Sequence, residues 1–259
     1  MANFHIRSNS LPSKSHPVTS DVEDHLRRLR SSEGTSTSVY EDLSILRDLQ
    51  EGVASLIQMS SIQQALNTEG SEKWANELLE ESLRLMDLCG FSRDVLSLSK
   101  GSIQELQSTI RRSRGESSIA AVTNAYKTSR KTIKKTVNKF SKNFKSFNKT
   151  NSPFMGEDSD LKAVFEMLRE TTGFGFSILK SVLMFLSGEE GSSKKRSWSL
   201  LSMLTPTSRA KETEAADMHN LLKQLKSTEV AIQEIEEELD TYYRTVVKSR
   251  VSLLNALNH

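Results

Sequence analysis

Cysteine and proline are scarce in this sequence, and each scarcity excludes a class of structure. Cys89 is the only cysteine, so no disulfide can form within the chain and no cluster of thiolates can bind zinc or an iron–sulfur group. No proline occurs between Pro17 and Pro153, and proline is the residue that most reliably interrupts a helix. We therefore expect a reducing compartment and long, uninterrupted helices.

Long apolar runs are also lacking. Residues 1–20 contain no apolar core of the length that a secretory signal needs. The longest apolar run, Phe174 to Leu186, is about 13 residues long and contains Lys180, whereas a bilayer-spanning helix needs roughly 20 apolar residues. We expect an intracellular, cytoplasmic protein without a transmembrane helix. We interpret the run as a buried helix, with a shallow membrane-inserted segment as the alternative.

Patterns that carry catalysis or bind metals are missing as well. No histidine stands in the H-E-x-x-H or E-x-x-H spacing of metal sites; the five are His5, His16, His25, His219 and His259. Neither a G-x-S-x-G elbow nor a phosphate-binding loop occurs, and Gly173-Phe174-Gly175 lacks the third glycine of a dinucleotide turn. We expect no enzymatic activity, no cofactor and no metal, and we interpret Cys89 as a packed, inert thiol.

The apolar residues that are present recur every three or four positions, which indicates an all-α fold. We predict a disordered tail over residues 1–19, followed by an elongated bundle of long antiparallel helices over residues 20–257. The predicted helices cover residues 21–30, 39 onward, 74–88, 91–112, about 117–149, about 158–187 and about 212–257, with a loop at 188–196. Ser20, Ser38 and Ser102 each begin an S-x-x-E capping box that marks a helix start, and Gly90 is expected to end a helix.

The last fifty residues carry a heptad pattern, in which apolar or small residues alternate spacings of four and three. Its members are Leu221, Leu225, Thr228, Ile232, Ile235, Leu239, Tyr242, Val246, Ser249 and Leu253. Such a stripe can pack on an antiparallel helix of the same chain or on a second chain. We favour packing within the chain, and the oligomeric state stays open.

Residues 117–156 contain no acidic residue at all. Nine basic residues fall in this segment: Lys127, Arg130, Lys131, Lys134, Lys135, Lys139, Lys142, Lys145 and Lys149. Apolar residues share the segment at helical spacing: Val122, Tyr126, Ile133, Val137, Phe140, Phe144 and Phe147. The candidate basic amphipathic face consists of Lys131, Lys134, Lys135, Lys139, Phe140, Phe144 and Phe147.

Two interpretations fit this basic helix. The one we favour is a bundle helix whose apolar stripe is core and whose lysines face the acidic stretch from Glu212 to Asp240, which holds nine acids. The alternative is a helix that binds an anionic membrane surface or calmodulin. Nucleic acid is disfavoured as a partner because a basic helix alone has no base-reading module.

The N-terminal tail contains a complete R-S-x-S-x-P motif, formed by Arg7, Ser8, Ser10 and Pro12. With Ser10 phosphorylated, this spacing is similar to the preferred docking site of 14-3-3 proteins, in which an arginine cluster binds the phosphate. A kinase could reach the motif in a disordered tail. The alternative is an inert tail.

Several blocks of residues resemble one family over essentially the whole chain, in order and with the expected gaps. They are Phe4-His5 with Arg7 to Ser13, His16-Pro17, Leu26 to Ser32, Gln63 to Leu66, Ser82 to Gly90, and Arg93-Asp94. These blocks resemble the plant-restricted helical proteins of unknown function grouped with the BYPASS-type proteins. The resemblance implies a role in root and shoot development and offers no catalytic residue or cofactor. Some relatives are named as chloroplast proteins, but the arginine-poor head of this chain disfavours a plastid.

The leading hypothesis is a non-enzymatic interaction or adaptor protein in plant development, regulated by phosphorylation of its tail. Its main rival is a peripheral membrane or calmodulin-binding protein that acts through residues 122–147. An enzyme whose mechanism the sequence hides is the third hypothesis.

Overall fold

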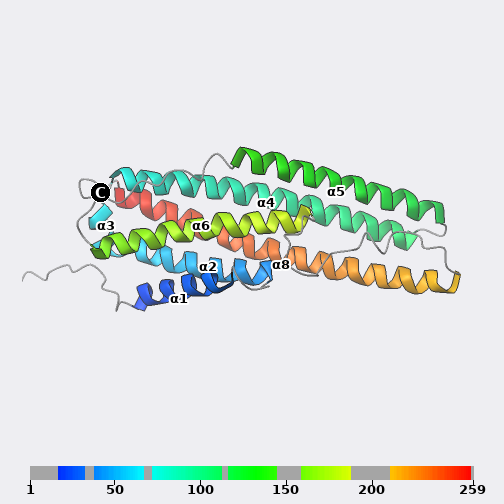
Figure 1. Ribbon diagram of the computed structural model, residues 1–259, viewed down its shortest axis with the longest axis horizontal. Helices are drawn as coiled ribbons and strands as arrows, with labels where there is room; N and C mark the ends of the chain where they lie inside the picture. Colours follow the sequence, from blue (N-terminus) through cyan, green and yellow to red (C-terminus); the bar gives the residue numbers. More distant parts are fainter. Residues whose placement is uncertain are drawn as a thin grey trace, which may run out of the picture. The chain divides into compact units, whose positions relative to one another are not determined.

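The computed structural model describes residues 17–32, 38–66, 72–112, 116–144, 159–187 and 211–257. Apart from Ser38 and the turn at Gln58 and Met59, every residue in these ranges is helical. The helices in these ranges are α1 (Pro17–Ser32), α2 (Val39–Ile57), α3 (Ser60–Leu66), α4 (Glu72–Arg112), α5 (Glu116–Phe144), α6 (Ser159–Ser187) and α8 (Lys211–Leu257) (Figure 1). The predicted all-α class is confirmed.

Helix starts follow the sequence signals only in part. Ser38 caps α2 as predicted, since its hydroxyl accepts a hydrogen bond of 3.1 Å from the Glu41 amide. The predicted helix start at Ser20 is wrong, because α1 begins at Pro17, a residue that suits the first turn of a helix. Ser102 also lies inside a helix, where its hydroxyl donates to the Leu98 carbonyl instead of capping an amide.

The predicted helix end at Gly90 is wrong, since α4 runs without a break from Glu72 to Arg112. Apolar residues continue at helical spacing on both sides of Gly90, and Leu88, Val95 and Leu96 are all buried. A glycine inside a helix costs only about 1 kcal/mol relative to alanine. Burial of the continuous stripe outweighs that cost, so the two predicted helices are one.

The chain folds into two compact units. The first comprises residues 1–89, 151–178 and 240–259, and the second comprises residues 90–150 and 179–239. Helices α4, α6 and α8 therefore each contribute one part to each unit.

In the first unit, α1 lies along α2 (Figure 1). Val22, Leu26 and Leu29 form the buried side of α1 and are at most 1% exposed. Gly52 of α2 makes the close approach possible, because a Cβ at this position would lie 2.8 Å from the Val22 Cγ2 atom. At the end of α1, Arg30 forms a two-pronged ion pair with Glu170 of α6, with one contact of 2.6 Å.

Polar side chains join the remaining helices of the first unit. Gln50 of α2 is buried and donates a hydrogen bond of 2.9 Å to Ser249 of α8, so the buried amide is satisfied. Arg250 of α8 donates to the Leu79 carbonyl and, at 2.9 Å, to the Ser82 hydroxyl of α4. Trp74 of α4 packs on Phe165 of α6 with ring centroids 3.8 Å apart.

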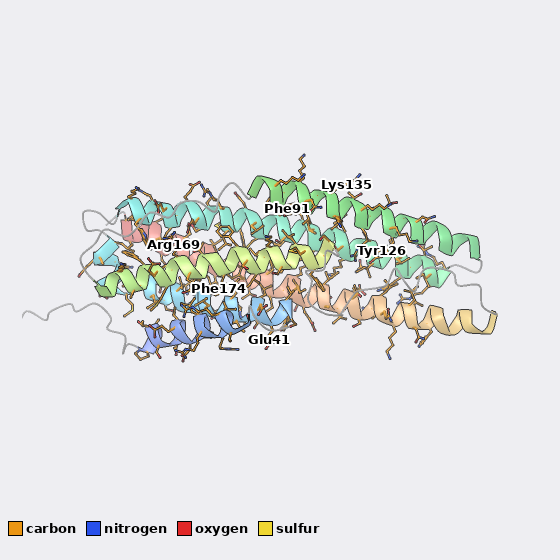
Figure 2. All side chains as sticks on the ribbon, in the orientation of Figure 1. Glu41, Phe91, Tyr126, Lys135, Arg169 and Phe174 are labelled. Atoms are coloured by element: carbon orange, nitrogen blue, oxygen red, sulfur yellow. The ribbon has the colours of Figure 1, made fainter. Side chains whose placement is uncertain are left out.

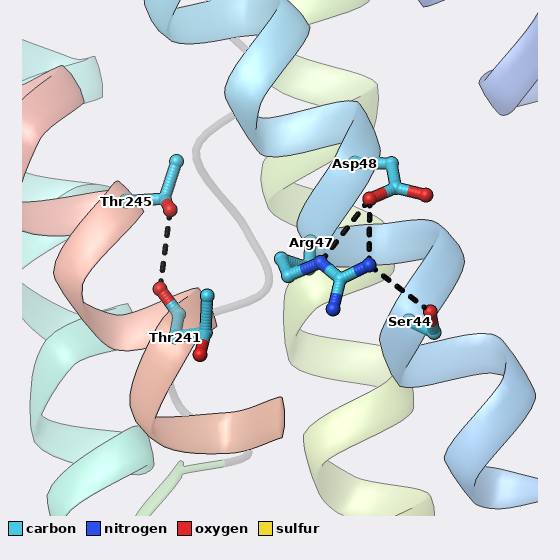
Figure 3. A network of polar contacts seen from close by, with 5 residues as sticks. All are labelled: Ser44, Arg47, Asp48, Thr241 and Thr245. Atoms are coloured by element: carbon cyan, nitrogen blue, oxygen red, sulfur yellow. Dashed lines mark hydrogen bonds and ion pairs between the residues drawn. The ribbon is translucent and has the colours of Figure 1, made fainter. Parts of the chain in front are cut away.

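Arg47 of the first unit bonds to two side chains of its own helix. The Arg47 guanidinium bonds to Asp48 at 2.9 Å and to Ser44 at 3.4 Å, both on α2 (Figure 3). On α8 the Thr245 hydroxyl similarly donates to the Thr241 carbonyl of the preceding turn. These contacts fix side-chain positions along single helices, whereas Gln50 and Arg250 link different ones.

The tightest packing in the first unit occurs at Gly175 of α6. A Cβ here would lie 2.5 Å from the Tyr242 hydroxyl oxygen and 3.0 Å from Leu85 Cδ1. Tyr242 and Leu85 are both fully buried, so neither can move into solvent. Burial raises the pKa of Tyr242 well above its usual range, and the nearby Cys89 thiol adds to the effect. Glycine is favoured at this position because Tyr242 of α8 and Leu85 of α4 leave no room for a side chain on α6.

In the second unit, α4 contacts both α5 and α8. Phe91 of α4 stacks on Phe140 of α5 with ring centroids 3.8 Å apart, and the hydroxyls of Ser102 and Ser129 lie 2.6 Å apart. Toward α8, Lys100 forms an ion pair of 3.0 Å with Glu236. Glu229 of α8 is the centre of a second α4–α8 contact, described below.

Glu229 accepts hydrogen bonds from both helices. Gln104 donates at 2.7 Å and Gln107 at 3.3 Å from α4, and Lys226 donates at 2.9 Å from its own helix. These donors, with Gln104 first, lower the pKa of Glu229 to about 2. Its side chain is only 12% exposed.

The predicted heptad stripe of α8 is buried throughout. All ten of its residues are at most 4% exposed within a single chain. The expectation that the stripe packs within the chain is therefore confirmed. The apolar run from Phe174 to Leu186 is likewise a buried part of α6, as Leu179 and Val182 are fully covered. Among the described helices, none has the length and apolar character to cross a bilayer.

Two glycines of α6 provide a matched test of the close approach. Gly175→Ala should lower the free energy of unfolding by about 1–3 kcal/mol, because the added methyl overpacks the core. Gly173→Ala should raise it by about 0.5–1 kcal/mol, since a Cβ at Gly173 meets nothing within 4 Å and alanine favours the helix. Urea unfolding followed by circular dichroism measures both. Equal effects of the two substitutions would contradict the close approach.

The low pKa of Glu229 gives a test at acid pH. Its contribution to stability is present above its unfolded pKa of about 4.3 and is lost as the pH falls toward 2. At neutral pH, Glu229→Gln should lower the free energy of unfolding by about 1–2 kcal/mol, the scale of hydrogen bonds to a charged group. The difference from the unmutated protein should shrink as the pH approaches 2.

The exposed Glu234 of the same helix supplies the control, so Glu234→Gln should have little effect at either pH. Urea unfolding at neutral and acid pH measures all three proteins. If the difference in free energy of unfolding between Glu229→Gln and the unmutated protein does not change with pH, the charge of Glu229 is not the source of the stabilisation.

Candidate interaction surface

The apolar side of α5 belongs to the core of the second unit. Tyr126, Ile133 and Val137 are 4%, 1% and 2% exposed. Tyr126 lies on the side of α5 that faces α4 (Figure 2). For these three residues the apolar stripe is core, as the bundle-helix interpretation expects.

Phe140 closes this contact at the far end of the stripe. Its ring lies nearly parallel to that of Phe91, at an interplanar angle of 4°, and the side chain is half-buried. The side chain of Phe144 and the whole of Phe147 lie outside the described residues, as does the side chain of Val122. The described aromatic ring of the predicted face, that of Phe140, therefore packs on α4.

Five lysines occupy the opposite side of α5 and are exposed. They are Lys131, Lys134, Lys135, Lys139 and Lys142, and we call them the basic face. Lys135 lies on the outer side of the helix (Figure 2). Their spacing places them along one side of the helix over about 16 Å, at 1.5 Å per residue. The structure thus separates the charged and apolar parts of the predicted amphipathic face.

Two acids of α8 contact α4. Lys100 of α4 holds Glu236, and Gln104 and Gln107 of α4 bind Glu229. We expected this acidic stretch to face the lysines of α5, but these two acids contact α4 instead. In the second unit α4 contacts α5 through Phe91 and α8 through Lys100 (Figure 1).

A small hollow lies behind α5, in the core of the second unit. Tyr126 and Arg130 of α5 line it together with Ser99 and Ser102 of α4 and Ile232 of α8. It has room for about one water molecule, so it is too small for an organic substrate. Arg130 is half-buried against this hollow and is not part of the basic face.

The other predicted sites divide into described and undescribed ones. Cys89 is fully buried, in agreement with its interpretation as a packed thiol. Within the described ranges, no three His, Cys, Asp or Glu side chains gather closely enough to hold a metal ion. The tail motif of Arg7, Ser8, Ser10 and Pro12 lies outside the described residues.

Comparison with known proteins supports one assignment. No curated protein and no solved structure matches the chain. Residues 42–256 match the family described as Protein BPS1, in agreement with the resemblance to BYPASS-type proteins. That range covers most of the chain and includes α4, α5, α6 and nearly all of α8. That family is not a known enzyme family. The chain therefore belongs to the BPS1 family, and this membership is consistent with a role in plant development.

Proposed function

We propose that this protein is a non-enzymatic intracellular binding protein of plant development, which engages an anionic partner through the basic face of α5. One observation carries the proposal. Five lysines are exposed on one side of a helix whose opposite side, at Tyr126, Ile133 and Val137, is packed in the core.

The packing of α5 makes this face suitable for binding. The Phe91–Phe140 stack and the Ser102–Ser129 contact fix α5 on α4, so the lysines are presented without the ordering of a flexible segment. Charges of one sign on one face raise the rate of encounter with an oppositely charged partner. An adaptor needs such a preformed surface.

Calmodulin is a poor fit for the same surface. A helix recognised by calmodulin lays its apolar side into the partner's groove. The corresponding residues of α5, Tyr126, Ile133 and Val137, are buried in the second unit. Binding calmodulin would require α5 to leave the bundle, whereas binding through the lysines does not.

We propose further that phosphorylation of Ser10 regulates this activity by recruiting a 14-3-3 protein. The support is the complete R-S-x-S-x-P motif formed with Arg7 and Pro12. Arginine clusters bind phosphoserine through several charge-assisted hydrogen bonds, which gives such docking its dependence on phosphorylation.

The basic face is tested by a matched pair of charge-reversal variants. Lys134→Glu, Lys135→Glu and Lys139→Glu together remove the positive field of α5. Arg111→Glu, Lys180→Glu and Lys223→Glu change the net charge equally at scattered exposed positions of the same unit. Proximity labelling in root tissue should show neighbours lost in the first variant and retained in the second. Identical neighbours for the first variant and the unmutated protein would refute the proposal.

The tail motif is tested with peptides of residues 4–16. The peptide phosphorylated at Ser10 should bind 14-3-3 protein measurably in fluorescence anisotropy, and the unphosphorylated peptide should not. Arg7→Ala and Pro12→Ala should weaken binding, since they remove the flanking determinants of the motif. In full-length protein, Ser10→Ala should abolish the phosphorylation-dependent pull-down. Retention of 14-3-3 by that variant would eliminate Ser10 as the docking site.

A further inference from the structure

We infer that the anionic partner of the basic face is the surface of a bilayer rich in acidic phospholipid, contacted by α5 while the helical bundle stays folded. This inference rests on the proposed function and specifies its partner. It differs from the binding mode of a free amphipathic helix, because no apolar side chain of α5 enters the lipid. The attraction is electrostatic and passes through lysine side chains alone.

The type of basic residue favours a diffuse anionic surface. All five members of the basic face are lysines, and the lone arginine among the described residues of α5, Arg130, lines the hollow behind the helix. Arginine offers a planar fork for two-point recognition of a fixed phosphate or carboxylate, whereas lysine presents a compact point charge. A row of lysine ammonium groups can therefore bind lipid headgroups that move within a fluid layer.

The aromatic residues of α5 disfavour nucleic acid as the partner. Proteins that bind single strands stack the bases on exposed aromatic rings. Tyr126 is buried, and the ring of Phe140 is already stacked on Phe91. Nothing among the described side chains of α5 therefore offers a base a stacking surface.

The geometry of the face suits contact with a plane. The lysines lie along one straight helix over about 16 Å, so their ammonium groups can reach a flat surface together. Near an acidic membrane each lysine strengthens binding by roughly fivefold. Five lysines acting together provide enough attraction for reversible binding without insertion.

The acidic residues of α8 would orient the unit on such a surface. Glu229 and Glu236 bind Lys226 and Lys100, whereas the acids Glu234 and Glu237 of α8 are exposed. An acidic membrane repels α8 and attracts α5. The second unit would therefore bind with α5 toward the lipid and α8 away from it.

Vesicle sedimentation with the full-length protein tests the inference. The vesicles consist of phosphatidylcholine alone or of phosphatidylcholine mixed with phosphatidylserine. The unmutated protein should sediment with the acidic vesicles only, and high salt should release it. The Lys134, Lys135 and Lys139 reversal should lower the partition coefficient by at least about 100-fold. The reversal at Arg111, Lys180 and Lys223 should lower it much less.

Hydrogen exchange separates binding by the folded bundle from release of α5. Amides of α5 should be as protected on vesicles as in solution if the helix stays packed on α4. Loss of their protection on vesicles would overturn the folded mode of binding. Circular dichroism of both variants confirms that they fold, which is expected because all six substituted side chains are exposed.

The outcomes also distinguish this inference from the proposed function. If neither vesicle binds but the α5 reversal still changes the labelled neighbours, the bilayer is wrong and an acidic protein is the partner. A duplex DNA fragment that binds more tightly than acidic vesicles and displaces them would also overturn the bilayer. If the reversal changes neither vesicle binding nor neighbours, both the inference and the proposed function fail.

Discussion

Burial of the apolar stripe along α8 is the interaction on which the rest of the structure depends. The stripe supplies Leu225, Ile232 and Leu239 to the core of the second unit and Tyr242 and Val246 to the core of the first. Burying apolar area provides the main favourable free energy of folding. The polar contacts that α8 makes, through Glu229, Ser249 and Arg250, then determine which neighbour each turn meets.

Because α8 packs so closely, small residues decide where it can lie. Gly175 lets α6 approach Tyr242 to a distance at which any side chain would collide. The Ser249 hydroxyl accepts a hydrogen bond from the buried side-chain amide of Gln50. A larger apolar residue at Ser249 would leave that amide unsatisfied in the core, which is costly. The stripe thus supplies the stability, and its small and polar members specify the arrangement of helices.

Sequence periodicity sufficed for the helical class and for the core of α8, because a repeat of three and four directly reflects which side of a helix is buried. It failed at Gly90, where the local preference of glycine is weak and the packing of both halves of α4 prevails. It could not separate Gly173 from Gly175, since the difference lies in Tyr242 and Leu85, which are distant in sequence. The Glu229 contacts were missed for the same reason.

The amphipathic pattern of α5 shows where sequence reasoning stops. Apolar residues at helical spacing beside lysines describe both a membrane-inserting helix and a bundle helix with a charged exterior. Only contacts decide between them: Phe91 covers Phe140, and Tyr126 and Ile133 are buried. Once the apolar side is used by the fold, the lysines are the exposed charged groups that the described part of this helix offers to a partner.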